Sequence, residues 1–166
     1  MALATFLLNW ALDSAAAILA LAPLIRSGRI AGHGWAYGAA FTAGSILILD
    51  FAAYLAHVSL HKLPLLWRVH RVHHCDRFVD VTTAFRQHPF EGIWRFIWTV
   101  IPVWLFGLPA AAVLVYRFLS AGNALFEHAN IRISRRLDRD LARIWVSPNI
   151  HKVHHSQWQQ QTDSNY

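Results

Sequence analysis

The chain has 166 residues, of which 55% are hydrophobic and only 14% charged, and this composition predicts a single domain embedded in a membrane. A single cysteine, Cys75, excludes a disulfide framework and a cysteine-based zinc site. The net charge of +6 does not indicate nucleic-acid binding, because membrane topology explains the positions of the basic residues.

The first apolar block, from about Leu3 to Ile25, is long enough to span a bilayer, which takes about 20 helical residues. It is too long for the core of a signal peptide and lacks a basic start, so we expect a retained membrane anchor. Asp13 within it is expected to face protein or a polar pocket. A glycine-rich polar turn follows, and we assign residues 1–34 to the anchor and this turn.

The second apolar block, from about Trp35 to Ala56, predicts another membrane helix, which leads directly into the first histidines. The stretch His57–Glu91 holds six histidines and is too polar and basic to lie in hydrocarbon. The third block, from about Ile93 to Leu125, is interrupted by Gly107-Leu108-Pro109. Two complete spans would need about 40 residues. We therefore expect a helical hairpin there, which enters the membrane and returns.

The distribution of lysine and arginine predicts the orientation. The loop between the first two blocks carries two such residues, against five in His57–Glu91 and six in the polar C-terminal region. The positive-inside rule therefore places both histidine-bearing regions in the cytoplasm. A returning hairpin between them is consistent with this placement.

Eight of the eleven histidines fall into three tight groups. Histidines four apart on a helix share one face, and this face extends back to Asp50, a natural partner for a ligand imidazole. Adjacent histidines diverge by about 100° on an ideal helix, so that they can point at neighbouring ions. Eight imidazoles are too many for one ion and suit two. The eight are His57, His61, His70, His73, His74, His151, His154 and His155.

The type of ligand narrows the choice of metal. A lone histidine such as His33 is better interpreted as a polar loop residue, but three spaced groups in one chain are not explained in that way. All-imidazole sites suit zinc, copper, iron or nickel. A structural zinc site takes four ligands and usually includes cysteine, and a haem pair would need single histidines within the membrane spans. Two nearby ions with open coordination positions favour O2 chemistry.

The histidine pattern resembles that of the fatty acid hydroxylase/sterol desaturase superfamily of membrane di-iron oxygenases. The resemblance covers about Asp50 to Tyr166 and extends beyond the histidine groups. Arg86-Gln-His88-Pro89 resembles an RxHP turn, and His128-Ala-Asn130 resembles the HxN motif that follows the hairpin. Ser147-Pro148-Asn149 resembles the segment before the last histidine group.

The resemblance implies an all-α fold with about four transmembrane or re-entrant helices and a cytoplasmic helical cap, formed here by residues 35–166. Two ferrous ions and O2 would then hydroxylate or desaturate a C–H bond of a lipid. Further candidates near the metal site are Asp50, His88, Asn123 and Glu127. The metal ligands carried over by position are His57, His61, His70, His73, His74, His128, His151, His154 and His155.

The chain has no GxGxxG nucleotide-binding motif, so we expect electrons to come from a partner protein. The family resemblance implies that this partner is a ferredoxin or a cytochrome b5-type donor. The basic stretch Arg132–Arg143 is a candidate docking surface for an acidic donor. Its basic residues are equally well explained as an orientation signal that contacts lipid headgroups.

The chain departs from the family in two places. Val58 occupies a position at which the family usually has arginine, and family members normally continue well past the pair that corresponds to Asn165-Tyr166. We therefore expect a domain truncated at its C-terminus, and one alternative is an inactive truncated homologue. Another alternative is a membrane metal-binding or transport protein without redox chemistry. Such a protein would have ligands inside its spans, where this chain has mainly Asp13 and Asp50.

Overall fold

The computed structural model describes residues 7–8, 11–12, 14–15 and 35–166. Most of the expected N-terminal anchor, including Asp13, and all of the turn that follows it lie outside these residues. Within residues 35–166 every regular element is a helix and no strand occurs. The expected all-α fold is confirmed for this part of the chain.

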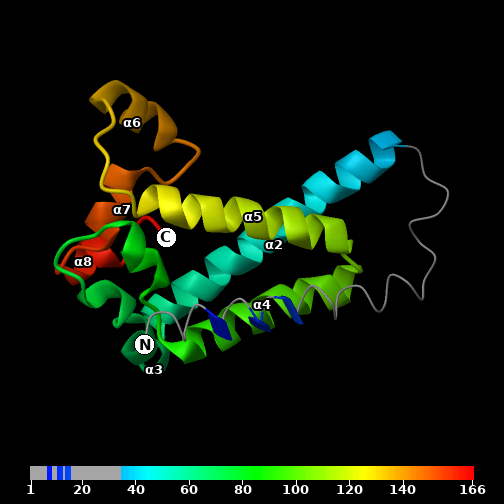
Figure 1. The fold of residues 1–166 in the computed structure, drawn as a ribbon, viewed down its shortest axis with the longest axis horizontal. Helices are drawn as coiled ribbons and strands as arrows, with labels where there is room; N and C mark the ends of the chain where they lie inside the picture. Colours follow the sequence, from blue (N-terminus) through cyan, green and yellow to red (C-terminus); the bar gives the residue numbers. More distant parts are fainter. Residues whose placement is uncertain (1–6, 9–10, 13, 16–34) are drawn as a thin grey trace.

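Three long helices carry the fold (Figure 1). They are α2 (Trp35–Lys62), α4 (Pro89–Phe106) and α5 (Ala110–Glu127). Helix α2 contacts both of the others. At 1.5 Å per residue, an 18-residue helix such as α4 or α5 is about 27 Å long, close to the thickness of the hydrocarbon layer.

The expected hairpin is formed by α4 and α5, which run in opposite directions (Figure 1). Gly107 ends α4 in the left-handed conformation with φ 63°, which glycine adopts without steric cost. Pro109 is the N-cap of α5 and Leu108 between them is buried. The interruption seen in the sequence is therefore the turn that sends the chain back.

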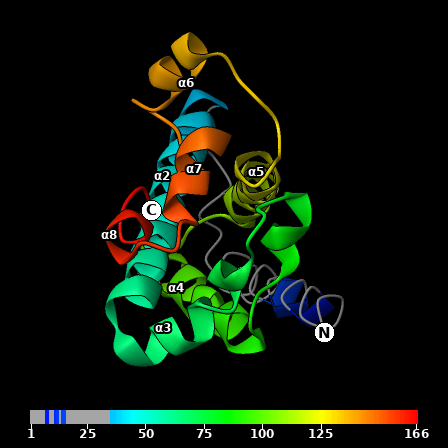
Figure 2. The same cartoon turned by 90° about the vertical axis from the view of Figure 1, so that its left-hand side faces the viewer.

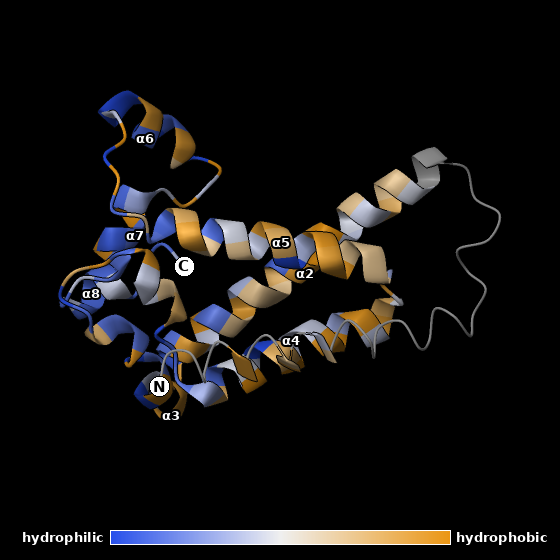
Figure 3. Ribbon diagram, viewed as in Figure 1, coloured by the Kyte–Doolittle hydropathy of each residue, from blue (hydrophilic) through white to orange (hydrophobic). Residues whose placement is uncertain are grey.

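One helix of the described residues, over Gly38–Lys62, is long and apolar enough to cross a membrane. Apolar residues predominate on the long helices, whereas polar residues gather around α7 and α8 (Figure 3). Side chains such as Trp104, Leu105 and Phe118 are more than 60% exposed. Exposed apolar surface of this extent suits contact with lipid.

The short helices gather at one end of the molecule. Figure 2 views the molecule from that end. Prolines occupy the first turns of α3, α4 and α7, where the missing N–H costs nothing. Ser147 caps α7 by accepting a hydrogen bond from the Ile150 N–H at 3.2 Å. The short elements are α3 (Pro64–His70), η1 (His73–Cys75), η2 (Val81–Phe85), α6 (Arg135–Leu141), α7 (Pro148–His154) and α8 (Gln159–Thr162).

The molecule has two kinds of interior. Between the long helices a small apolar core forms around Leu49, Val113 and Tyr116. Among the short helices, by contrast, the largest fully buried side chains include His70, His154 and Glu91. Polar side chains are rarely buried unless each has a partner. This polar interior is therefore the candidate functional site.

Candidate metal centre

Nine buried or half-buried histidines form two neighbouring clusters at the polar end of the long helices. Within each cluster one ring nitrogen per residue lies within 4.8 Å of all the others. The five-histidine cluster contains His57, His61, His70, His74 and His154. The four-histidine cluster contains His73, His128, His151 and His155. The structure thus brings together all nine histidines that the family resemblance implied as ligands.

In the five-histidine cluster, α2 presents His57 and His61 from one face, with their Nε2 atoms 3.2 Å apart. His70 Nε2 lies 3.2 Å from His57 Nε2 and 3.2 Å from His74 Nε2. Nitrogens bound at about 2.0–2.1 Å to one ion lie roughly 3.0–3.4 Å from one another. These spacings are therefore those of neighbouring ligands around a single metal ion.

The four-histidine cluster shows the same convergence. His128 Nε2 lies 3.1 Å from His73 Nε2 and 3.0 Å from His151 Nε2. The His155 ring completes the group, with its centroid 4.6 Å from that of His73. Because His128 directly follows α5 and His151 lies on α7, this cluster depends on how the hairpin packs against the cap.

Each adjacent histidine pair is divided between the clusters. The rings of His73 and His74 are perpendicular, at 90°, and those of His154 and His155 are inclined at 85°. His74 of one cluster stacks on His155 of the other, with centroids 4.3 Å apart. Two ions held in these clusters would therefore be near neighbours.

Several ring nitrogens are buried without any hydrogen-bond partner among the described residues, including His154 Nε2 and both nitrogens of His155. A buried polar atom without a partner is unfavourable by about 1–3 kcal/mol. Coordination of a metal ion would satisfy these nitrogens. The donor set, its spacing and its orphaned nitrogens all fit a pair of metal ions.

A buried ion pair stands behind the five-histidine cluster. His70 Nδ1 donates to Glu91 Oε2 at 3.0 Å, and the Glu91 side chain is completely buried. Arg95 donates to the other carboxylate oxygen from two nitrogens, at 3.1 and 3.2 Å. A carboxylate behind a ligand histidine fixes its orientation and strengthens it as a donor. His154 Nδ1 donates instead to the Ser164 carbonyl at 2.7 Å.

Sequence reasoning missed Glu91 and Arg95. A usable signal was present, since two charged residues four apart at the start of an apolar block indicate an ion pair on one helix face. Asp163 was also missed. Its Oδ1 lies 3.6 Å from His61 Nδ1, beyond hydrogen-bond distance, and its Oδ2 pairs with Lys62 at 3.1 Å.

The four-histidine cluster has weaker partners. His128 Nδ1 donates to the Ala124 carbonyl at 2.6 Å. Glu127 Oε1 lies 3.9 Å from His151 Nε2 and 4.0 Å from His128 Nδ1, too far for a hydrogen bond to either. Asn123 Nδ2 holds the other Glu127 oxygen at 3.0 Å. Glu127 thus lies near this cluster without a bond to it, and Asn123 reaches it only through Glu127. That either residue completes the site stays a prediction.

Asp50 and His88 have other partners. Asp50 is exposed and interacts electrostatically with Tyr116 on α5. It precedes His57 by seven residues, or about 10 Å along the helix, which is too far to reach a ligand ring. His88 is also exposed and caps α4, because its Nδ1 accepts from the Phe90 N–H at 3.2 Å. The structure therefore gives neither residue a contact with the clusters.

Burial lowers the pKa of six clustered histidines in and beside the cap. Burial, followed by the neighbouring imidazoles, lowers the pKa of His155 from 6.5 to about 2. Burial lowers the pKa of His154 to about 4, although its hydrogen bond to the Ser164 carbonyl partly opposes this. The pKa values of His73, His74, His128 and His151 are lowered as well, with burial as the largest cause. Neutral imidazole is the form that binds metal.

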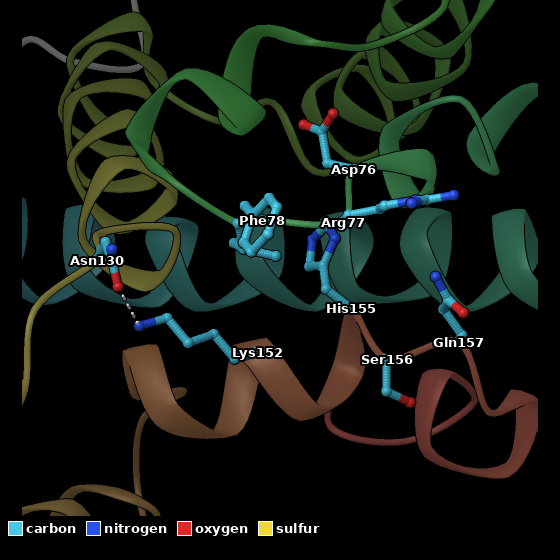
Figure 4. Close-up of a pocket in the computed structure, with 9 residues that line it drawn as sticks. Asp76, Arg77, Phe78, Asn130, Lys152, His155, Ser156 and Gln157 are labelled. Atoms are coloured by element: carbon cyan, nitrogen blue, oxygen red, sulfur yellow. Dashed lines mark hydrogen bonds between the residues drawn. The ribbon is translucent and has the colours of Figure 1, made fainter.

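Two pockets approach the site from different sides. One, of about 450 Å³, reaches His155 between Arg77, Phe78 and Lys152, and Figure 4 shows Lys152 bonded to Asn130 at its edge. The other, of about 370 Å³, lies between α5 and Trp145 and is almost entirely apolar. The polar pocket therefore reaches the four-histidine cluster at His155, whereas the apolar pocket contains no histidine and is linked to Glu127 through Asn123.

Comparison with known proteins gives concordant matches. The family model described as fatty acid hydroxylase matches residues 42–166. The ornithine lipid hydroxylase OlsE of Rhizobium tropici is 30% identical over 121 residues, which are 73% of this chain and 36% of that protein. The alkylglycerol monooxygenase of Caenorhabditis elegans is 27% identical over 117 residues, 70% of this chain and 22% of that protein.

The human alkylglycerol monooxygenase is 26% identical over 136 residues, which are 80% of this chain and 27% of that protein. The chain thus spans about a third or less of the length of these relatives. No solved structure gives a significant match.

Proposed function

The chain belongs to the fatty acid hydroxylase family, and on that premise we propose that it is a membrane-bound di-iron oxygenase that hydroxylates a lipid. The observation that carries the proposal is the pair of adjacent histidine clusters at the end of a candidate membrane helix. Hydroxylation is favoured over desaturation because the relatives are named as a lipid hydroxylase and as monooxygenases.

The proposed reaction balances as one lipid C–H bond, O2, two electrons and two protons giving a C–OH group and water. Two iron ions in the clusters would supply the activation of O2. The protein's own residues position the ligands and the substrate. Glu91 orients His70, and the main-chain carbonyls of Ala124 and Ser164 orient His128 and His154.

The proposed topology follows from the place of the clusters. His57 and His61 lie in the last two turns of the candidate membrane span, so a lipid in the bilayer is within reach of the site. We assign the histidine-bearing end to the cytoplasm from the distribution of basic residues, and residues 1–34 to an additional anchor. Residues 35–166 form the proposed catalytic domain.

An acidic electron carrier, of the ferredoxin or cytochrome b5 type, is proposed to dock at the pocket beside His155. Arg77 and Lys152 provide positive charge there, and Phe78 is 85% exposed. His155 stacks on His74, so electrons that arrive there are close to both clusters. The Arg132–Arg143 stretch lacks such a connection, since α6 within it buries no side chain. We assign that stretch to lipid headgroups.

The test is metal analysis of the purified chain combined with lipid profiling under isotopically labelled O2. Two irons per chain and a lipid that carries the labelled oxygen are expected, and His73→Ala should lose the product together with iron. His88→Asn is the matched control, because asparagine keeps the helix cap and His88 lies outside both clusters. If the purified chain binds iron but consumes no O2, it is instead an inactive homologue or a metal-binding protein.

A further inference from the structure

An apolar pocket of about 370 Å³ lies between α5 and the segment that follows α6. Helix α5 contributes Phe118, Leu119, Gly122 and Phe126, and Leu141 and Trp145 form the opposite wall. Its volume lies within the roughly 300–1,000 Å³ of small-molecule sites, which are mostly apolar with a few polar groups. We propose that this pocket holds the alkyl chain of the lipid substrate. This inference rests on the proposed function and names the substrate's binding site.

The outer end of the pocket is continuous with apolar surface. Phe118 is 78% exposed and Leu119 is 50% exposed, on a helix that Figure 3 shows to be largely apolar. On the opposite wall Trp145 is half exposed, and Ile144 beside it is 82% exposed. Exposed tryptophan among basic residues is typical of a membrane interface. An alkyl chain can therefore enter from the bilayer without crossing water.

The polar residue of the pocket leads towards the metal site. Asn123 Oδ1 accepts a hydrogen bond from Trp145 Nε1, and Asn123 Nδ2 donates to Glu127 Oε2 at 3.0 Å. Glu127 in turn lies 3.9 Å from His151 Nε2. Asn123 and Glu127 thus lie between the apolar pocket and the four-histidine cluster, although Glu127 bonds no histidine of that cluster. The occupant is an alkyl chain because the walls are apolar, and Asn123 marks the end of the pocket that lies towards the four-histidine cluster.

The wall of the pocket opposite α5 belongs to a segment with little packing of its own. Helix α6 buries no side chain and stands apart from the long helices (Figure 1). Two hydrogen bonds hold this segment: Trp145 donates to Asn123 on α5, and Ser147, which caps α7, donates to Asp138 on α6.

A pair of glycines makes the proposal testable. A Cβ atom added at Gly122 would meet nothing within 4 Å, so leucine there fits the fold but fills the pocket. Gly44 on α2 has the same open surroundings and lies outside the pocket, so Gly44→Leu is the matched control. Both changes improve helix propensity by a similar amount.

The measurement is photolabelling of the metal-free chain in lipid nanodiscs by an alkylglycerol with a diazirine on its alkyl chain. Labelling of Phe118–Phe126 and Leu141–Trp145 is expected in the unmodified chain and in Gly44→Leu, and unlabelled alkylglycerol should compete for it. Gly122→Leu should lower the competed labelling at least about tenfold. Equal labelling in all three chains, or labelling that is not competed, would overturn the assignment.

The labelling experiment and the test of the proposed function can fail independently of each other. Labelling of the metal-free chain requires no turnover. A chain that is labelled as expected but makes no hydroxylated lipid would therefore contradict the proposed function and support the pocket assignment. If the iron-loaded chain is active, Gly122→Leu should raise KM for the lipid at least about tenfold, with its iron content unchanged. An unchanged KM would overturn the pocket assignment alone.

Discussion

The two histidine clusters share the segments around His73-His74 and His154-His155 but differ in what lies behind their rings. Behind the five-histidine cluster the buried Glu91 bonds His70 and pairs with Arg95, and the first two histidines of this cluster lie on the longest helix. The four-histidine cluster has one donor fewer, and Glu127 lies near it without contact. His155 of this second cluster also lines the polar pocket.

This difference indicates a division of roles. An ion with five imidazoles has little coordination space left, whereas an ion with four retains open positions for O2 or water. We infer that an ion in the five-histidine cluster would mainly be held in place and that an ion in the four-histidine cluster would face the substrate. The following predictions test this comparison, beginning with the largest expected effect.

Removal of one ligand should affect the two clusters unequally. His151→Ala leaves three imidazoles in the four-histidine cluster, and we expect one iron per chain and no product. His61→Ala leaves four in the other cluster, so both irons should remain, one of them bound more weakly. Metal analysis after dialysis against a chelator, together with product assays, would check this. Loss of one iron in both variants would contradict the comparison.

Glu91→Gln should weaken metal binding at the five-histidine cluster alone. Loss of the carboxylate's charge behind a ligand histidine typically lowers metal affinity roughly 10–100-fold. Competition with a chelator and the ligand-field spectrum of the Co²⁺-loaded chain would measure the change. Asp140→Asn is the control, because Asp140 is an exposed carboxylate on α6. An equal effect of Glu91→Gln on both ions would show that the ion pair does not distinguish them.

Thr83→Val should weaken both clusters equally. The buried Thr83 hydroxyl donates to Asp76 Oδ2 at 3.0 Å and accepts from the Asp80 N–H at 3.2 Å. These bonds hold the loop after His73 and His74, which contribute one ligand to each cluster. We expect the free energy of unfolding to fall by about 1–3 kcal/mol in chemical denaturation.

Thr99→Val is the control for this variant, since that hydroxyl only bonds the carbonyl of Arg95 on its own helix, at 3.0 Å. A similar loss of stability in both variants would indicate a general effect of removing a threonine hydroxyl.

Acid should destabilise the metal-free chain in two different windows of pH. The pKa of His154 is about 4 and that of His155 about 2 in the folded chain, against 6.5 when unfolded. Below pH 6.5 the unfolded chain therefore binds more protons, and stability is lost as the pH falls towards each folded value. The slope is at most about 1.4 kcal/mol per pH unit for each histidine.

Denaturation of the metal-free chain at a series of pH values would separate the two residues. His154→Gln should reduce the slope only between pH 6.5 and about 4, whereas His155→Gln should reduce it further into acid. The difference arises because the Ser164 carbonyl stabilises protonated His154, and His155 has no such partner. Identical profiles of the two variants would contradict this explanation.

Much of the site was predictable because local spacing sets direction. His57 and His61 lie on one face because they are four residues apart on a helix, and adjacent histidines diverge for the same reason. The hairpin turn was marked by Gly107 and Pro109. The full list of nine histidines, with His128 among them, came from the family resemblance and not from spacing.

Other features arise only from packing between distant segments. His73 meets His128 across 55 positions of the chain, and Glu91 meets His70 across 21. Asp50, which shares the helical stripe of His57, interacts with Tyr116 on α5 instead. Periodicity orders side chains around one helix, but the partner that each one meets depends on how α2, the hairpin and the cap pack together. The sequence by itself therefore determined which histidines gather, and the tertiary structure decided how they divide into two unequal clusters.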